Sequence, residues 1–133
     1  MNSKAVLSQA EVGQILTAAR AEAQANQWAV TIVVVDDGGH PLALERLDGC
    51  APASVYIATE KARTSALGRR ESKSYEDMVN AGRYAFLSAP LLTSLEGGVP
   101  IVFDGQVIGA VGVSGVKPEQ DAQVAKAGAQ SVK

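Results

Sequence analysis

Residues with catalytic or metal-binding chemistry are few in this 133-residue chain. His40 is its only histidine and Cys50 its only cysteine, so a zinc site of the usual histidine and cysteine spacing cannot form within one chain. Any Ser-His-Asp or Cys-His arrangement would depend on His40. The spacing between His40 and Cys50 indicates no chemistry by itself, and we interpret Cys50 as a small loop residue.

Glycine-rich segments flank the predicted strands and form the second group of candidates. They are Asp36–His40, Arg46–Gly49, Gly97–Pro100 and Ser114-Gly115. Glycine lets a backbone approach a ligand closely and exposes amide donors, although each segment is also typical of a plain turn. Neither a P-loop nor a dinucleotide-binding glycine pattern occurs. Because these segments gather at the ends of two predicted hairpins, we hypothesise a binding site near the hairpin mouths.

The hydrophobic pattern predicts the elements that must position these residues. Ser8 and Glu11 have the spacing of a capping box, and a helical apolar stripe follows them. A run of β-branched residues predicts a strand that is buried on both faces, and Asp104-Gly105 predicts a hairpin turn. The expected elements are a helix at 9–26, strands at 29–35 and 40–46, helices at 53–67 and from 74, strands at 99–103 and 106–114, and a helix at 118–131.

Composition and charge narrow the classes of function. The length suits one domain over residues 1–133, and the single cysteine excludes an intrachain disulfide. The net charge is −2 and no long basic stretch occurs, so we expect no nucleic-acid partner. We see no signal peptide and no apolar run long enough to span a membrane. The expected location is therefore the cytoplasm, with no membrane association.

Six segments, taken in order and spacing, are similar to one known family over nearly the whole chain. They are Val35–His40, Arg46–Gly49, Ile57–Thr64, Gly97–Ile101, Asp104–Gly115 and Pro118–Asp121. They resemble the GlcG/HbpS-like family, the haem-binding proteins that include the C-terminal domain of PduO. The resemblance implies a profilin-like α/β (α+β) fold, in which helices pack on an antiparallel sheet. It also implies a homo-oligomer built from dimers, and a small-ligand-binding or haem-binding role associated with catabolic metabolism.

The first functional hypothesis is haem binding. Haem iron commonly takes an axial histidine, so His40 is the candidate ligand. Tyr75 and Met78 are secondary candidates. Arginine and lysine form charge-assisted bonds with carboxylates, which suits the haem propionates. The candidate cations are Arg46, Lys61, Arg69 and Arg70.

Two alternatives stay open. An enzyme or accessory protein acting on a small carboxylate would hold it with Lys61 or Arg46, and would move a proton with Asp36 or Glu60. Its expected pocket is lined by Lys61, Gly97, Gly98 and Ser114. The sequence places Lys61 on the apolar side of its helix, so its amine either snorkels to solvent or faces that pocket. The other alternative is a non-catalytic oligomeric scaffold that binds no ligand.

Overall fold

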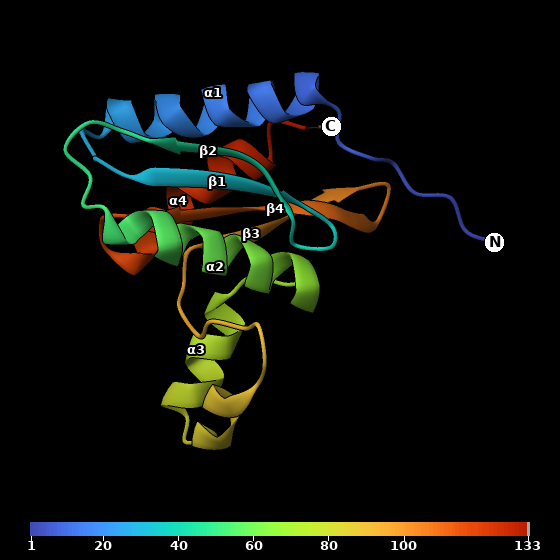
Figure 1. The fold of residues 1–133 in the computed structure, drawn as a ribbon, viewed down its shortest axis with the longest axis vertical. Coiled ribbons are helices and arrows are strands. Elements are labelled where there is room, and N and C mark those ends of the chain that lie inside the picture. Colours follow the sequence, from blue (N-terminus) through green and yellow to red (C-terminus); the bar gives the residue numbers. More distant parts are fainter. Residues whose placement is uncertain (133) are drawn as a thin grey trace.

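A computed structural model describes residues 1–132 and shows one four-stranded sheet with helices on both faces (Figure 1). The strand order is β2-β1-β4-β3 and every neighbouring pair is antiparallel. The predicted fold class is therefore confirmed. The elements are α1 (Gln9–Ala25), β1 (Thr31–Asp36), β2 (Pro41–Arg46), α2 (Ala53–Gly68), α3 (Lys73–Asn80), the 3-10 helix η1 (Tyr84–Ser88), β3 (Gly98–Phe103), β4 (Gln106–Ser114) and α4 (Pro118–Ala129).

Local signals set most element boundaries where the sequence predicts them. The capping box at the start of α1 is confirmed, because the backbone N–H of Ser8 donates to Glu11 Oε1 at 3.3 Å. The first strand starts two residues later than predicted, at Thr31, and extends to Asp36. No helix within residues 1–132 is long and apolar enough to cross a membrane.

The sheet separates two buried layers. Ile32 and Val34 of β1 belong to the larger cluster under α1 and α4, whereas Val33 and Val35 belong to a smaller cluster under α2. This alternation confirms that the β-branched run is buried on both faces. Helix α2 packs mainly on β4, β1 and β3, so edge strand β2 is left largely uncovered on that face.

Two paired glycines allow α2 to lie very close to the sheet. Gly98 of β3 is opposite Gly112 of β4 in the register. A Cβ atom at Gly112 would lie 2.1 Å from the carbonyl oxygen of Ala58, and one at Gly98 would lie 2.2 Å from that of Lys61. Both distances are far below van der Waals contact. These glycines are therefore required for backbone packing between helix and sheet.

Gly112→Ala is expected to lower the free energy of unfolding by about 1–3 kcal/mol, because α2 must move to admit the methyl group. Gly13→Ala is the matched control, since nothing lies within 4 Å of a Cβ at that exposed position of α1. It is expected to raise stability by about 0.5–1 kcal/mol through helix propensity. Urea unfolding measures both values. Equal effects of the two substitutions would contradict the close packing of α2.

Candidate functional site

His40 lies in the tight turn that joins β1 to β2. The carboxylate of Asp36 holds this turn, because its Oδ1 accepts the backbone N–H of Gly38 at 2.9 Å and that of His40 at 3.0 Å. Gly39 adopts a φ of 81°, which a glycine reaches without strain. The backbone on both sides of the imidazole is thus fixed by residues that the sequence already marks as turn formers.

The imidazole of His40 is held at one nitrogen and open at the other. Nδ1 lies 3.1 Å from Asp36 Oδ1 and 3.2 Å from Oδ2, and the histidine side chain is 79% exposed. When the Nδ1 hydrogen points at the carboxylate, Nε2 presents its lone pair to solvent. Metal-binding histidines commonly have this carboxylate partner, which fixes the tautomer and the ring orientation.

The same contacts keep Asp36 ionised. Partial burial opposes ionisation of the carboxyl, but the backbone N–H donors of His40 and Gly38 and the His40 ring outweigh it and lower the pKa of Asp36. At any pH above this lowered pKa the Asp36 carboxylate is ionised and can accept the Nδ1 hydrogen. A carboxylate partner of this kind holds the ring of a metal-binding histidine in one orientation.

Three cationic side chains surround the turn. Arg63 of α2 packs over Gly39, where a Cβ would lie 2.8 Å from Arg63 Cγ. Its terminal nitrogen pairs with Glu60, whereas its Nε is buried and has no hydrogen-bond partner among residues 1–132. Lys4 Nζ lies 3.0 Å from the Asp37 carboxylate, and Arg69 donates to the Asp37 carbonyl oxygen. Arg63 is a contact that sequence reasoning missed, because it depends on how α2 crosses the sheet.

Lys61 is buried in an ion pair. Its Nζ lies 3.0 Å from Asp121 Oδ2 of α4 and donates to the Val113 carbonyl oxygen at 3.0 Å. Both side chains are at most 5% exposed. Of the two placements that the sequence leaves open for the Lys61 amine, snorkelling to solvent is therefore wrong. Its partner Asp121 also accepts the backbone N–H of Val116, and sequence reasoning did not find it.

The glycines beside Lys61 accommodate this pair. A Cβ at Gly97 would lie 2.8 Å from Lys61 Nζ and 2.7 Å from the Val113 carbonyl oxygen. The Gly98 N–H donates to Ser72 Oγ at 2.8 Å. The small-carboxylate hypothesis assigns the Lys61 ammonium and the Gly98 amide to a bound anion. In this structure both groups already have hydrogen-bond partners within the protein.

The sheet register decides which candidate residues lie together. Thr31 is opposite both Arg46 and Ser114, so these two residues lie at one end of the sheet. Gly98 begins β3 at that same end, next to Lys61. His40 lies at the opposite end of β2, beyond Pro41. One chain therefore brings Lys61, Gly97, Gly98 and Ser114 into one region and keeps His40 apart from it.

Two other candidate residues, Tyr75 and Cys50, are buried and packed against neighbouring side chains. Tyr75 is buried, stacks on Phe86 with ring centroids 4.8 Å apart, and lies under the guanidinium of Arg70. Cys50 is buried, and its Sγ lies 2.8 Å from Ser54 Oγ. Tyr75 and Cys50 therefore have packing partners within their own chain.

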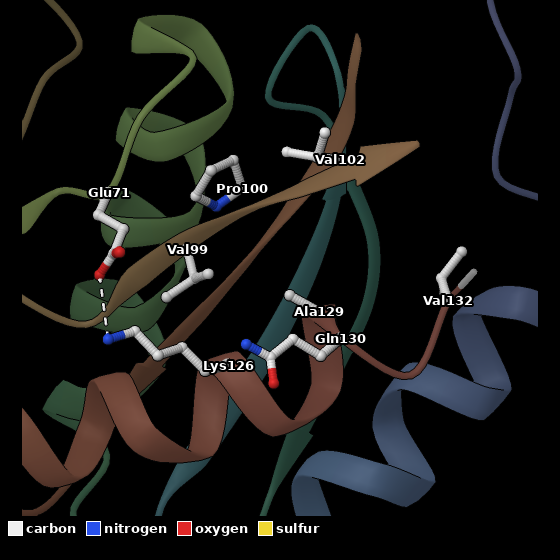
Figure 2. Close-up of a pocket in the computed structure, with 8 residues that line it drawn as sticks. All are labelled: Glu71, Val99, Pro100, Val102, Lys126, Ala129, Gln130 and Val132. Carbon is white, nitrogen blue, oxygen red and sulfur yellow. Dashed lines mark ion pairs between the residues drawn. The ribbon is translucent and has the colours of Figure 1, made fainter. Parts of the chain in front are cut away.

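A hollow of about 610 Å³ lies between β3 and α4 (Figure 2). Figure 2 shows the ion pair of Glu71 and Lys126 at one end, with 3.6 Å between the charged atoms. Its other lining residues are Val99, Pro100, Val102, Ala129, Gln130 and Val132. None of these residues is a histidine, cysteine, methionine or tyrosine, so the hollow offers no usual axial ligand for haem iron.

Comparisons with known proteins show the family and support the fold. A model of the family described as "Haem degrading protein HbpS-like" matches residues 7–130. The chain belongs to this HbpS-like family. It is 65% identical to Protein GlcG of Escherichia coli K12 over 114 residues, which cover 86% of this chain and 85% of GlcG.

Two solved structures of this fold are also similar. The structure of HbpS shares 25% identity with a TM-score of 0.90, and the match covers 100% of this chain and 94% of HbpS. A PduOC:Heme complex shares 26% identity with a TM-score of 0.87, and the match covers 97% of this chain and 96% of that one. The HbpS-like resemblance that the sequence segments indicate is therefore confirmed.

Lys61→Met is expected to lower the free energy of unfolding by about 3–5 kcal/mol, because it leaves the Asp121 carboxylate buried without its cation. Lys61→Met combined with Asp121→Asn removes that charge and is expected to recover a large part of the loss. Chemical denaturation at neutral pH measures both variants. A double variant that is less stable than the single one would contradict this account of the pair.

The loss of unfolding free energy in Lys61→Met is also expected to depend on pH. Burial raises the pKa of Asp121, and Lys61 and the Val116 N–H oppose that rise. A raised pKa means that the folded state binds the proton more tightly, so the contribution of this carboxyl to stability falls as the pH rises through the raised pKa. Without Lys61 nothing opposes the effect of burial as strongly, so the fall in stability with rising pH is larger. Unfolding at about pH 4 and about pH 7 tests this, because protonation of Asp121 should make the variant's deficit smaller in acid.

Proposed function

We propose that this protein binds haem at the β1–β2 turn, with Nε2 of His40 as the axial ligand of the iron. The observation that carries the proposal is the pairing of His40 Nδ1 with the Asp36 carboxylate at 3.1 Å, which leaves the other ring nitrogen exposed. A carboxylate at one ring nitrogen orients a histidine so that its other nitrogen can bind a metal such as haem iron. The chain has no other histidine to take this role.

The charges around the turn support a ligand with acidic groups. Beside the turn lie Lys4 of the N-terminal segment, Arg63 of α2 and Arg69, which directly follows α2. Lys4 and Arg69 pair there with Asp37, and Arg63 pairs with Glu60. Haem carries two propionates, and arginine binds carboxylates through charge-assisted hydrogen bonds.

The relatives support the same cofactor. The family model is named for haem degradation, and one structural neighbour is described as a heme complex. Bound haem supplies one-electron and oxygen chemistry. The residues of this chain supply the ligand atom, its orientation and the counter-charges. Because His40 is exposed rather than enclosed, the geometry favours capture and release of haem over chemistry in a water-excluded site.

Hemin titration followed by absorbance tests the proposal. The wild type is expected to give a saturable Soret shift, and His40→Ala is expected to lose it. Asn80→Ala, an exposed substitution on α3, is the matched control and should titrate like the wild type. A saturable shift that survives in His40→Ala would place the iron ligand elsewhere, and no saturable shift in the wild type would reject haem binding.

Asp36→Asn tests the role of the carboxylate. The amide oxygen can still accept the N–H groups of Gly38 and His40, so the turn is expected to keep its shape. The negative charge beside Nδ1 is lost, and changes of this kind weaken metal binding by about 10- to 100-fold. The dissociation constant for hemin measures the effect. An unchanged constant, together with an unchanged melting temperature, would show that Asp36 does not support the ligand.

A further inference from the structure

We propose that the Asp37 carboxylate occupies the place of a haem propionate and is displaced when haem binds. In the structure Asp37 pairs with Lys4 and Arg69, two of the cations beside the His40 turn. A ligand that brings its own carboxylate can take over both cations, whereas a ligand without one would leave them unpaired. Asp37 is thus a specificity-determining residue of the site, and this inference rests on the proposed haem function.

Two cations from separate segments of the chain converge on one oxygen of Asp37. Lys4 Nζ lies 3.0 Å from Asp37 Oδ2, and the Arg69 guanidinium lies 4.0 Å from the same atom. Among residues 1–132, no other carboxylate pairs with two cations. A carboxylate between an ammonium and a guanidinium is also the arrangement that a bound propionate requires. Asp37 therefore occupies, within its own chain, the position of an acidic group of the ligand.

The contact of Asp37 with these cations is exposed, so it is easily exchanged. The side chains of Lys4, Asp37 and Arg69 are 31%, 46% and 47% exposed. Ion pairs with this exposure contribute little to stability, because water solvates the separated charges well. A propionate of a porphyrin that is already bound through His40 has a high effective concentration at the turn. Such a propionate therefore has only a weak contact to replace.

The Arg69 guanidinium has further hydrogen bonds that do not depend on the Asp37 carboxylate. Its Nη1 donates to the backbone carbonyl oxygen of Asp37 and to that of Ala66. Arg69 adopts a φ of 58° at the end of α2, where the backbone favours glycine. These two bonds are what an arginine adds at that position. They keep the guanidinium beside the turn when the carboxylate leaves, so it is already oriented for a propionate.

The position of Asp37 along the chain suits the dimensions of haem. Asp37 precedes His40 by three residues. The chain between their Cα atoms therefore spans at most about 11 Å. That limit is comparable to the distance from the iron of haem to its propionate carboxylates. A porphyrin whose iron is bound by His40 can thus bring a propionate to Lys4 and Arg69, where it meets the Asp37 carboxylate.

Hemin titration of Asp37→Ala tests the exchange. The variant removes the competing carboxylate and leaves both cations, so the dissociation constant is expected to fall by about two- to tenfold, as for the loss of one or two exposed ion pairs. Asp77→Ala is the matched control, because Asp77 of α3 also forms an exposed ion pair with a lysine, Lys73, at 2.8 Å. A constant that does not fall in Asp37→Ala, or that falls equally in Asp77→Ala, would overturn the inference.

Hemin dimethyl ester, in which both propionates are uncharged esters, gives a second readout. Its iron can still bind His40, but its ester groups do not compete with Asp37 for the two cations. The wild type and Asp37→Ala are therefore expected to bind the ester with equal affinity. A gain in Asp37→Ala that is as large for the ester as for hemin would show that Asp37 does not act on the propionates, and would overturn the inference.

Asp37→Glu shows whether the charge or the altered turn is responsible. Glutamate keeps a carboxylate that can pair with both cations, so this variant is expected to bind hemin like the wild type. A gain in Asp37→Glu as large as in Asp37→Ala would contradict the exchange. Wild-type protein that binds no hemin would reject the proposed function and the exchange together. Hemin binding that is lost in His40→Ala but unchanged in Asp37→Ala would overturn the exchange alone.

Discussion

One buried ion pair joins the two faces of this molecule. Lys61 comes from α2 on one side of the sheet and Asp121 from α4 on the other, and their charged atoms lie 3.0 Å apart. Buried charges are tolerated only when the pair is complete and its remaining hydrogen bonds are satisfied, which Val113 and Val116 achieve here. The pair fixes where α2 lies. Helix α2 in turn carries Arg63 over the turn that presents His40, so the candidate site depends on it.

The sequence predicted the fold well because its strongest signals are local. The β-branched run of β1, the Asp104-Gly105 turn and the capping box of α1 each act within a few residues. The burial of Lys61 gave no such signal. Asp121 is 60 residues further along the chain, and the periodicity of one helix cannot name a partner on another. The glycines at 97 and 98 predict a close approach to the backbone, but the sequence could not show that α2 rather than a ligand makes that approach.

The part of the candidate site around His40 was predictable because its signals are also local. His40 stands out because it is the only histidine and follows a turn sequence, and its contact with Asp36 spans four residues. The grouping of the other candidates depends on strand order and register, which no local pattern encodes. The register puts Arg46 next to Thr31 and far from the turn.

The most direct test of the account is a crystal structure of the protein grown with hemin. The account predicts iron bound to Nε2 of His40, with Nδ1 still on the Asp36 carboxylate and the Arg63 guanidinium near a propionate. The hollow between β3 and α4 is the alternative place for haem, because it measures about 610 Å³, but no residue that lines it is a usual iron ligand (Figure 2). Haem found in that hollow, with His40 free in solvent, would contradict the account.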